Sequence, residues 1–222
     1  MNTRSNKEEL GRNWLKEVIK PGLQASQVIG IYNDASKIYD QYTVDCKYQG
    51  PTIMAEEVAR LVAEELRHEV RVLDVGAGTG LLGRELHKLG FSNIDALEPS
   101  EGMMNILKNT GHYRVKYQEL MVVGQHTVPQ DTYDLLVMCG SMAPGHIPAE
   151  CVEDFIRVTK PGGWVVLLIR LEYLLTAEDY KDKLEAHMNR LQKENMWCKE
   201  VRKVVPNYCT DHEGVLFIYR VL

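Results

Sequence analysis

The chain has 222 residues, 45% of them hydrophobic, which is enough for one domain with a substantial core. Its net charge of −5 disfavours a nucleic-acid partner, because binding to phosphates needs a basic surface. The five cysteines lie far apart and form no Cys-x-x-Cys pair, so neither a disulfide framework nor a metal site is expected. No apolar run approaches the ~18 residues that span a bilayer. We therefore expect a protein of the cytoplasm, or of cytoplasm and nucleus, without a membrane anchor and monomeric by default.

Residues 1–50 are predicted to form a helical segment that covers the domain at 51–222. A weak apolar stripe in the first twenty residues ends at Pro21-Gly22, which stops a helix. Residues 28–48 are rich in tyrosine. Two interpretations of these tyrosines stay open. They close a ligand pocket, or they are half-buried packing residues. A further helix is expected from Pro51 onward.

From residue 71 the apolar segments alternate between strand and helix, the pattern of a parallel sheet covered on both faces. The expected strands are 71–75, 93–97, 114–117, 133–138, 163–169, 199–206 and 214–221. The expected helices between them are 79–89, 101–108 and 148–159. One long helix is predicted at 176–196, with Thr176 as its N-cap and an apolar stripe formed by Tyr180, Leu184, Met188 and Leu191.

Residues 71–83 place a glycine-rich turn between a short apolar strand and a helix. Gly76, Gly78 and Gly80 allow the backbone to turn sharply and let a ligand come close to main-chain N–H groups. The positive end of the helix that follows favours an anionic group such as a carboxylate. The stretch is therefore the first candidate for a cofactor site.

Two nucleotide-binding classes also use glycine-rich turns. A phosphate loop of the nucleotide hydrolases is excluded, because no lysine lies between Gly76 and Gly83. The dinucleotide spacing Gly-x-Gly-x-x-Gly is met by Gly78, Gly80 and Gly83. Asp74 stands just before the turn, however, where it would repel a pyrophosphate and attract a cationic ligand. An NAD-dependent oxidoreductase is therefore the weakest alternative.

Residues 72–80 resemble the first motif of class I methyltransferases that use S-adenosylmethionine, in which two apolar residues, Asp and another apolar residue precede Gly-x-Gly-x-Gly. Glu98 closes the next predicted strand, where an acid can accept both hydrogen bonds from a ribose diol. Residues 98–103 and 160–163 are also similar to this family. The resemblance covers residues 30–222 and implies an α/β, Rossmann-like fold. Its seven-stranded sheet is mostly parallel, with helices on both faces and an antiparallel last strand.

A closer resemblance appears in the second half of the chain. The stretches 133–141, 145–148, 157–163 and 184–197 are similar to the methyltransferase-like family of the Williams-Beuren syndrome chromosomal region. That family belongs to the class I group, and the resemblance supplies no methyl acceptor.

The resemblance implies cofactor contacts just after each strand. Asp74 is expected at the methionine ammonium, and Glu98 at the ribose. Met103 either contacts the adenine or is an ordinary helix residue. The adenine edge is assigned to Glu119 and the Leu120 N–H, or to Gln118 if the register shifts by one. The full expected set is Asp74, Gly76, Ala77, Gly78, Thr79, Gly80, Glu98, Pro99, Ser100, Met103, Gln118, Glu119, Leu120, Cys139 and Gly140.

The segment after the fourth predicted strand is expected to face the transferred methyl group. His146 is the candidate catalytic base, because it titrates near neutral pH and lies in a Pro/Gly-rich loop. The alternative is a solvated loop histidine. Arg170 either binds an acidic group of the acceptor or is a surface arginine at a strand end. Tyr39, Ser141 and Tyr173 complete the expected substrate contacts.

The segment after the fourth strand lacks the Asp/Asn-Pro-Pro-Tyr/Phe sequence of enzymes that methylate nucleobase or glutamine amino groups. This leaves a small molecule or a protein side chain as the acceptor. The sequence therefore predicts an S-adenosylmethionine-dependent methyltransferase that works by in-line displacement and releases S-adenosylhomocysteine. A module that binds this cofactor without catalysis is the alternative.

Overall fold

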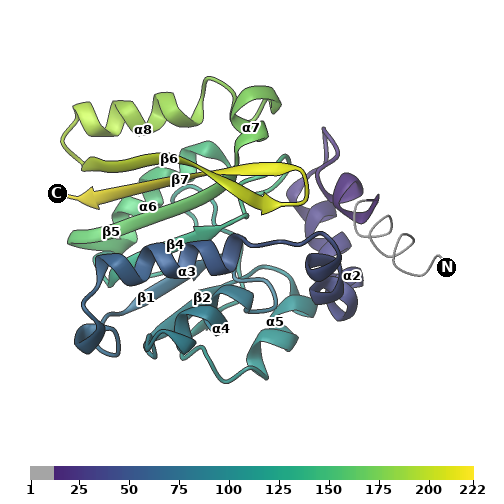
Figure 1. The fold of residues 1–222 in the computed structure, drawn as a ribbon. Coiled ribbons are helices and arrows are strands. Elements are labelled where there is room, and N and C mark those ends of the chain that lie inside the picture. The colour runs from purple at the N-terminus through teal and green to yellow at the C-terminus, as the bar shows by residue number, and fades with distance from the viewer. Residues whose placement is uncertain (1–12) are drawn as a thin grey trace.

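A seven-stranded sheet in the order β3-β2-β1-β4-β5-β7-β6 forms the centre of the computed structural model, which describes residues 13–222 (Figure 1). The first twelve residues of the expected N-terminal segment lie outside the described part. The strands are β1 (Val72–Val75), β2 (Ile94–Leu97), β3 (Lys116–Tyr117), β4 (Tyr133–Cys139), β5 (Thr159–Arg170), β6 (Trp197–Cys209) and β7 (His212–Val221).

The sheet is parallel except at one strand. β1 pairs in parallel with both β2 and β4, β2 pairs with β3, and β4 pairs with β5. β7 runs antiparallel to both β5 and β6, so the expected topology is confirmed. Because the chain leaves β1 toward β2 on one side and returns as β4 on the other, a crevice opens at the carboxyl ends of these strands.

The fifth strand begins earlier than expected. β5 starts at Thr159, which pairs with Tyr133, and the register shifts before Trp164 pairs with Leu135. The Pro161-Gly162 stretch therefore forms an irregularity within the strand instead of a turn ahead of it. Gly162 provides the left-handed backbone, with φ of 78°, that this irregularity uses.

Helices cover both faces of the sheet. They are α2 (Ala25–Asp45), α3 (Gly50–Leu61), α4 (Leu81–Lys88), α5 (Glu101–Lys108), α6 (Val152–Val158), α7 (Leu171–Thr176) and α8 (Leu184–Lys193), with 3₁₀ turns at Glu64–Leu66 and Ala149–Cys151. Residues 13–18 are also helical. Alternate residues of β1 point to opposite faces. Val72 joins the core under α3, α4 and α5, whereas Leu73 and Val75 join the core under α6, α7 and α8.

The single long helix predicted at 176–196 is wrong, because the chain forms α7 and α8 with a turn between them. Thr176 ends α7 and does not cap a helix. Asp182 has a left-handed backbone, with φ of 59°, which interrupts the helix. The Tyr180 hydroxyl lies 2.8 Å from each of two carbonyl oxygens in the 143–147 loop, which holds the turn against the sheet edge. The predicted apolar stripe is nevertheless buried.

Helix α2 lies at the edge of the sheet where the parallel strands end, away from the C-terminus of the chain (Figure 1). Its Asn33 carbonyl oxygen Oδ1 accepts hydrogen bonds from the Ser100 hydroxyl at 2.7 Å and from the Gly102 N–H at 3.0 Å. These bonds attach α2 to the start of α5. Among the described helices, none is long and apolar enough to cross a bilayer.

Candidate functional site

A cavity of about 180 Å³ lies at the carboxyl ends of β1, β2 and β4 and is covered by α2. It brings together residues from segments far apart in the sequence. Of the expected cofactor residues it is lined by Asp74, Gly76, Ala77, Gly78, Thr79, Glu98, Pro99, Ser100, Met103, Leu120, Cys139 and Gly140. All five expected substrate residues line it as well, namely Tyr39, Ser141, His146, Arg170 and Tyr173.

The glycine loop forms the floor of the cavity under β1. Gly78 has a φ of 57°, and a Cβ built there meets no atom within 4 Å, so this backbone faces open space. Gly76 has the opposite requirement, because its Cβ would lie 2.5 Å from the Cβ of Ser141. Ser141 donates a hydrogen bond to the Gly76 carbonyl at 3.1 Å. Gly80, with φ of 93°, is the N-cap of α4 and does not line the cavity.

Asp74 lies at the end of β1 and is 1% exposed. Its carboxylate accepts a hydrogen bond from the Tyr113 hydroxyl at 2.7 Å, and that hydroxyl accepts one from the Gly83 N–H at 3.0 Å. Burial raises the pKa of Asp74 to about 7, against the opposing effect of Tyr113. No local sequence pattern connects Tyr113 to the glycine loop, so this contact is not predictable from the sequence.

Gly83 is explained by the same contact. A Cβ at this position would lie 2.3 Å from the Tyr113 ring, so only glycine leaves room for it. The match to the dinucleotide spacing therefore reflects packing between α4 and Tyr113 and is no evidence for a pyrophosphate ligand.

Glu98 lies at the end of β2 and is 6% exposed. One carboxylate oxygen accepts the Gly78 N–H and the other accepts the Ser100 N–H, each at 2.8 Å. Burial raises the pKa of Glu98 to about 7, and these two hydrogen bonds oppose the rise. Each oxygen keeps a free lone pair that can accept from a ligand hydroxyl.

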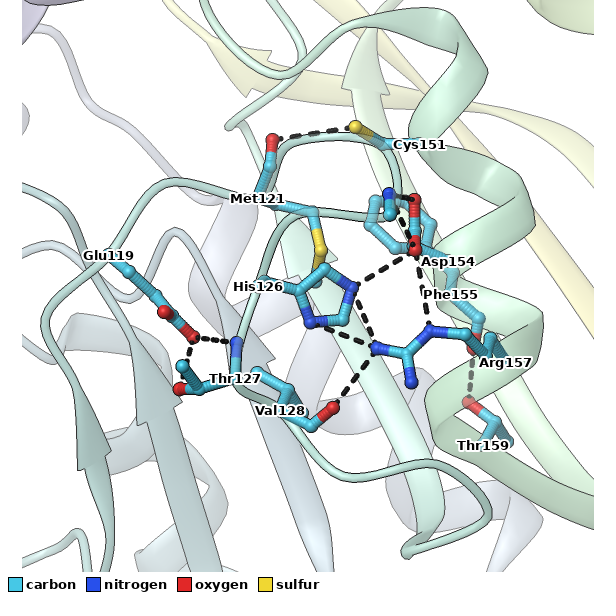
Figure 2. Close-up of polar contacts among 11 residues, drawn as sticks. Glu119, Met121, His126, Thr127, Val128, Cys151, Asp154, Phe155, Arg157 and Thr159 are labelled. Atoms are coloured by element: carbon cyan, nitrogen blue, oxygen red, sulfur yellow. Dashed lines mark hydrogen bonds and ion pairs between the residues drawn. The ribbon is translucent and has the colours of Figure 1, made fainter.

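The structure does not bring Gln118 and Glu119 to the cavity. Gln118 is exposed, and Glu119 accepts hydrogen bonds from the N–H and the hydroxyl of Thr127, both at 2.9 Å (Figure 2). Glu119 thus joins the two ends of the 118–128 loop. Leu120 does line the cavity, together with Met103, which is 1% exposed.

The 118–128 loop is fastened to α6 by a buried polar cluster that the sequence analysis missed (Figure 2). His126 places Nε2 3.1 Å from the Asp154 carboxylate and accepts at Nδ1 from Arg157 at 3.0 Å. Arg157 also donates to the Val128 carbonyl at 3.0 Å. Helix α6 therefore fixes the loop that carries Leu120 to the cavity wall.

Helix α2 packs on the site, and its tyrosines both contact other rings and line the cavity. Asp40 accepts a hydrogen bond from the hydroxyl of Thr79, in the glycine loop, at 2.6 Å. The Trp14 ring packs against Tyr32, Tyr39 and Tyr42, with centroids 5.3–5.6 Å apart. All four rings line the cavity.

His146 is half-buried and lines the cavity, so it is not a solvated loop histidine. Its Nδ1 lies 2.9 Å from the Pro144 carbonyl, which requires that Nδ1 carry the hydrogen. Nε2 is then the acceptor for the Tyr32 hydroxyl at 2.9 Å. Burial lowers the pKa of His146, which leaves the ring neutral near pH 7.

Arg170 is 8% exposed and is therefore not a surface arginine. Its Nη2 donates to the His212 ring and forms an ion pair with Glu172. The guanidinium lies over the ring of Tyr173, 5.4 Å from its centroid.

Cys139 has no features of a nucleophile. Its sulfur lies 3.2 Å from the Tyr48 hydroxyl, and burial raises the pKa of the thiol to about 12. The thiol is therefore protonated at neutral pH, as expected for a strand-end cysteine. Among residues 13–222, no group of three or more His, Cys, Asp or Glu side chains is placed to hold a metal ion.

The site has one acid near the end of β1, a glycine loop directly after that strand and a second acid directly after β2, which is the arrangement that the class I resemblance implies. A family model described as a methyltransferase domain matches residues 47–210, which is most of the chain. The chain belongs to the methyltransferase domain family. This result confirms the expected class and leaves the oxidoreductase alternative without support.

Relatives of this methyltransferase agree with that assignment. It is 29% identical to human Methyltransferase-like protein 27 over 174 residues, covering 78% of this chain and 69% of the relative. It is 33% identical to the Ubiquinone biosynthesis O-methyltransferase of Leptothrix cholodnii over 103 residues, which is 44% of this chain and 43% of that enzyme. That match spans less than half of either chain.

Solved structures share the fold of this methyltransferase. A SAM-dependent methyltransferase from Leishmania major superposes with a TM-score of 0.64 at 19% identity, over 88% of this chain and 82% of that one. A second, from Mesorhizobium loti, gives 0.56 at 18% identity, over 77% of this chain and 100% of that one. At these identities the likeness concerns the fold.

Proposed function

We propose that this methyltransferase takes its methyl group from S-adenosylmethionine and transfers it to a small-molecule acceptor. The observation that carries the proposal is the pair of buried acids, Asp74 and Glu98, on either side of a glycine loop that faces open space. The cavity lies beneath α2, and this favours a small acceptor over a side chain of another protein.

The residues present suit this cofactor. Gly78 leaves a cradle that a Cβ would enter, and the positive end of α4, which begins at Leu81, suits a carboxylate. Asp74 suits an ammonium group, and the free lone pairs of Glu98 suit a ribose diol. Two carboxylates in one cavity also favour a cationic ligand. When bound, the cofactor supplies a methyl group activated by a positively charged sulfur.

At the adenine end we assign contacts to Met103, to Pro99 and to the N–H of Leu120, all of which belong to residues that line the cavity. Glu119 does not contact the adenine in this proposal, and its hydrogen bond with Thr127 holds the loop that carries Leu120. The flat face of an aromatic base suits a polarizable thioether side chain such as that of Met103.

At the acceptor end we assign His146 as the proton acceptor. Nε2 carries the basic lone pair of the neutral ring, and this lone pair accepts a hydrogen bond from the Tyr32 hydroxyl. An acceptor hydroxyl that displaces Tyr32 would give its proton to Nε2, and its oxygen would take the methyl group that the cofactor supplies when bound. Tyr39, Ser141 and Tyr173 position the acceptor. The O-methyltransferase names of several relatives support an oxygen acceptor.

We also propose a cellular compartment, an oligomeric state and the absence of nucleic-acid and membrane partners. None of the five cysteines, all of which lie within the described residues, forms a disulfide, which supports a reducing compartment such as the cytoplasm or nucleus. The net charge of −5 supports a protein that does not act on nucleic acid. We propose a monomer and no membrane partner.

Turnover tests the proposal against the alternative of a binding module. The purified full chain is incubated with S-adenosylmethionine and a panel of small phenols, hydroxy acids and amines, and release of S-adenosylhomocysteine is followed. We expect acceptor-dependent release that His146→Gln lowers about 100-fold or more, the usual contribution of a positioned base. Tight cofactor binding without release for any acceptor would support the non-catalytic module.

A further inference from the structure

The cavity contains a buried arginine at a distance from the glycine loop. Arg170 ends β5, and β4 separates β5 from β1 in the sheet. The Gly140 N–H donates to the Leu168 carbonyl at 2.9 Å, so the ends of β4 and β5 lie side by side. Arg170 therefore lies on the acceptor side of the cavity, beyond the segment after β4 that carries His146.

The hydrogen-bonding capacity of Arg170 is only partly used. Its Nη2 contacts His212 and Glu172, whose side chains are 34% and 48% exposed. Its Nε is buried and has no acceptor among the described residues. A buried N–H without an acceptor is costly, and native structures rarely keep one without a partner. The guanidinium is therefore set up for an acceptor that a ligand supplies.

Charges are separated along the cavity. Among the described residues that line it, Asp74 and Glu98 are the acids, and Arg170 is the only lysine or arginine. The acids belong to the end proposed for the cationic cofactor. The arginine belongs to the other end, where an anionic group gains most from a positive charge held in a buried place.

Aromatic rings form the wall next to the arginine. Tyr173 lies beneath the guanidinium, and the hydroxyls of Tyr48 and Tyr208 are 3.3 Å apart in the same cavity. Rings of this kind pack well against a flat apolar body and offer hydroxyl donors at its edge. The guanidinium fork matches the two oxygens of a carboxylate.

We infer that the methyl acceptor is a small carboxylic acid with an apolar, preferably aromatic, body, and that Arg170 binds its carboxylate. The inference rests on the proposed function, because it makes the arginine end of the cavity the acceptor site. The carboxylate binds to Arg170 and so orients the acceptor, and a separate hydroxyl of the same molecule takes the methyl group.

Calorimetric titration with defined probes tests the inference. Benzoate, phenylacetate and 4-hydroxybenzoate are compared with their neutral primary amides, each with and without saturating S-adenosylhomocysteine. We expect at least one acid to bind about tenfold tighter than its amide, and the preference to disappear in Arg170→Gln. Arg170→Lys keeps the charge and loses the fork, and is expected to retain only part of the preference.

Arg202→Gln is the matched control. Arg202 also forms an ion pair, with Glu185 at 2.8 Å, and lies 5.6 Å from the Phe217 ring centroid, but it does not line the cavity. This variant should keep the acid preference, and thermal unfolding of each variant reports whether it folds. If no acid binds better than its amide, or if Arg170→Gln keeps the preference, the inference is wrong. If wild-type protein does not bind S-adenosylhomocysteine, the proposed function itself fails, which is a separate result.

Discussion

The Tyr113 hydroxyl lies 2.7 Å from the carboxylate of Asp74, a residue 39 positions earlier in the chain. Both groups are buried, and the same hydroxyl accepts the Gly83 N–H at 3.0 Å. The bond orients the carboxylate at the start of the glycine loop and opposes the effect of burial on its pKa. Tyr113 therefore positions the acid that the proposed function assigns to the methionine ammonium.

Tyr113→Phe should weaken cofactor binding. The variant keeps the ring that fills the space above Gly83 and removes the hydrogen bond to Asp74. We expect a loss of about tenfold in affinity for S-adenosylmethionine at pH 7, and a loss of about 1–2 kcal/mol in the free energy of unfolding. Calorimetry and chemical denaturation measure the two effects.

Tyr133→Phe is the control for this prediction. Tyr133 is also a buried tyrosine that donates to an acid, Asp95, at 3.0 Å, but neither residue lines the cavity. The Tyr133→Phe variant should have a lower free energy of unfolding than the wild type and the same affinity for the cofactor. Equal affinity in the two variants would contradict a positioning role for Tyr113.

Cofactor affinity should depend on pH through Asp74 and Glu98, whose pKa values burial raises to about 7. A cationic ligand binds best when both acids are ionised, so affinity should fall as the pH is lowered from about 8 to about 6, with proton release on binding in that range. Titrations in buffers of different ionisation enthalpy count the protons. Asp74→Asn should remove part of the dependence, and an affinity constant over this range contradicts the assignment.

The same two acids should affect stability without ligand. Their folded pKa values lie above the unfolded values of about 4, so the folded state holds more protons between these limits. Their contribution to the free energy of unfolding is complete below about pH 4 and is lost as the pH rises to about 7. In the Asp74→Asn variant, urea denaturation at several pH values should show a smaller loss of unfolding free energy over this range. If the free energy of unfolding depends on pH as steeply as in the wild type, Asp74 does not make this contribution.

Gly78→Asn should abolish cofactor binding while the protein stays folded. Asparagine tolerates a left-handed backbone, but its side chain would enter the open space above the loop. We expect affinity to fall by more than about tenfold. Gly111→Asn is the control, because Gly111 also has a left-handed backbone with no atom within 4 Å of a built Cβ and does not line the cavity. Comparable affinities for the two variants would rule out the cradle.

Asp40→Ala should loosen α2 from the glycine loop, because it removes the acceptor for the Thr79 hydroxyl. In ligand-free protein, we expect amide hydrogen exchange in α2 to rise about tenfold, the size of one hydrogen bond to a charged group. Asp45→Ala is the control on the same helix, since the hydrogen bond that Asp45 accepts among the described residues comes from Gln41 of α2, at 2.8 Å. If both variants exchange alike, the bond to Thr79 does not hold α2 in place.

The sequence could predict those parts of the site that follow one strand directly. Asp74, the glycine loop and Glu98 sit within a few residues of a buried apolar run, so a local pattern defines them. His146 and Arg170 were found in the same way, from their places after strand ends. The sheet topology was also accessible, because alternation of strand and helix has few solutions.

Contacts between distant segments could not be predicted. Tyr113, Asp40 and His126 act on partners about 30 residues away or more, and no periodicity marks such pairs. The place of Glu119 after a strand predicts a contact with the adenine, but the loop turns back and Thr127 donates hydrogen bonds to its carboxylate instead. The prediction of one helix at 176–196 is wrong for a similar reason, since the hydrogen bonds from Tyr180 to the 143–147 loop outweigh local helix propensity.

Calorimetric titration of the full chain with S-adenosylmethionine and, separately, with S-adenosylhomocysteine measures whether the cavity binds this cofactor. We expect saturable binding of both at one site, with affinity lost in Gly78→Asn and kept in Gly111→Asn. A folded protein that binds neither compound would contradict the assignment of the cavity to this cofactor.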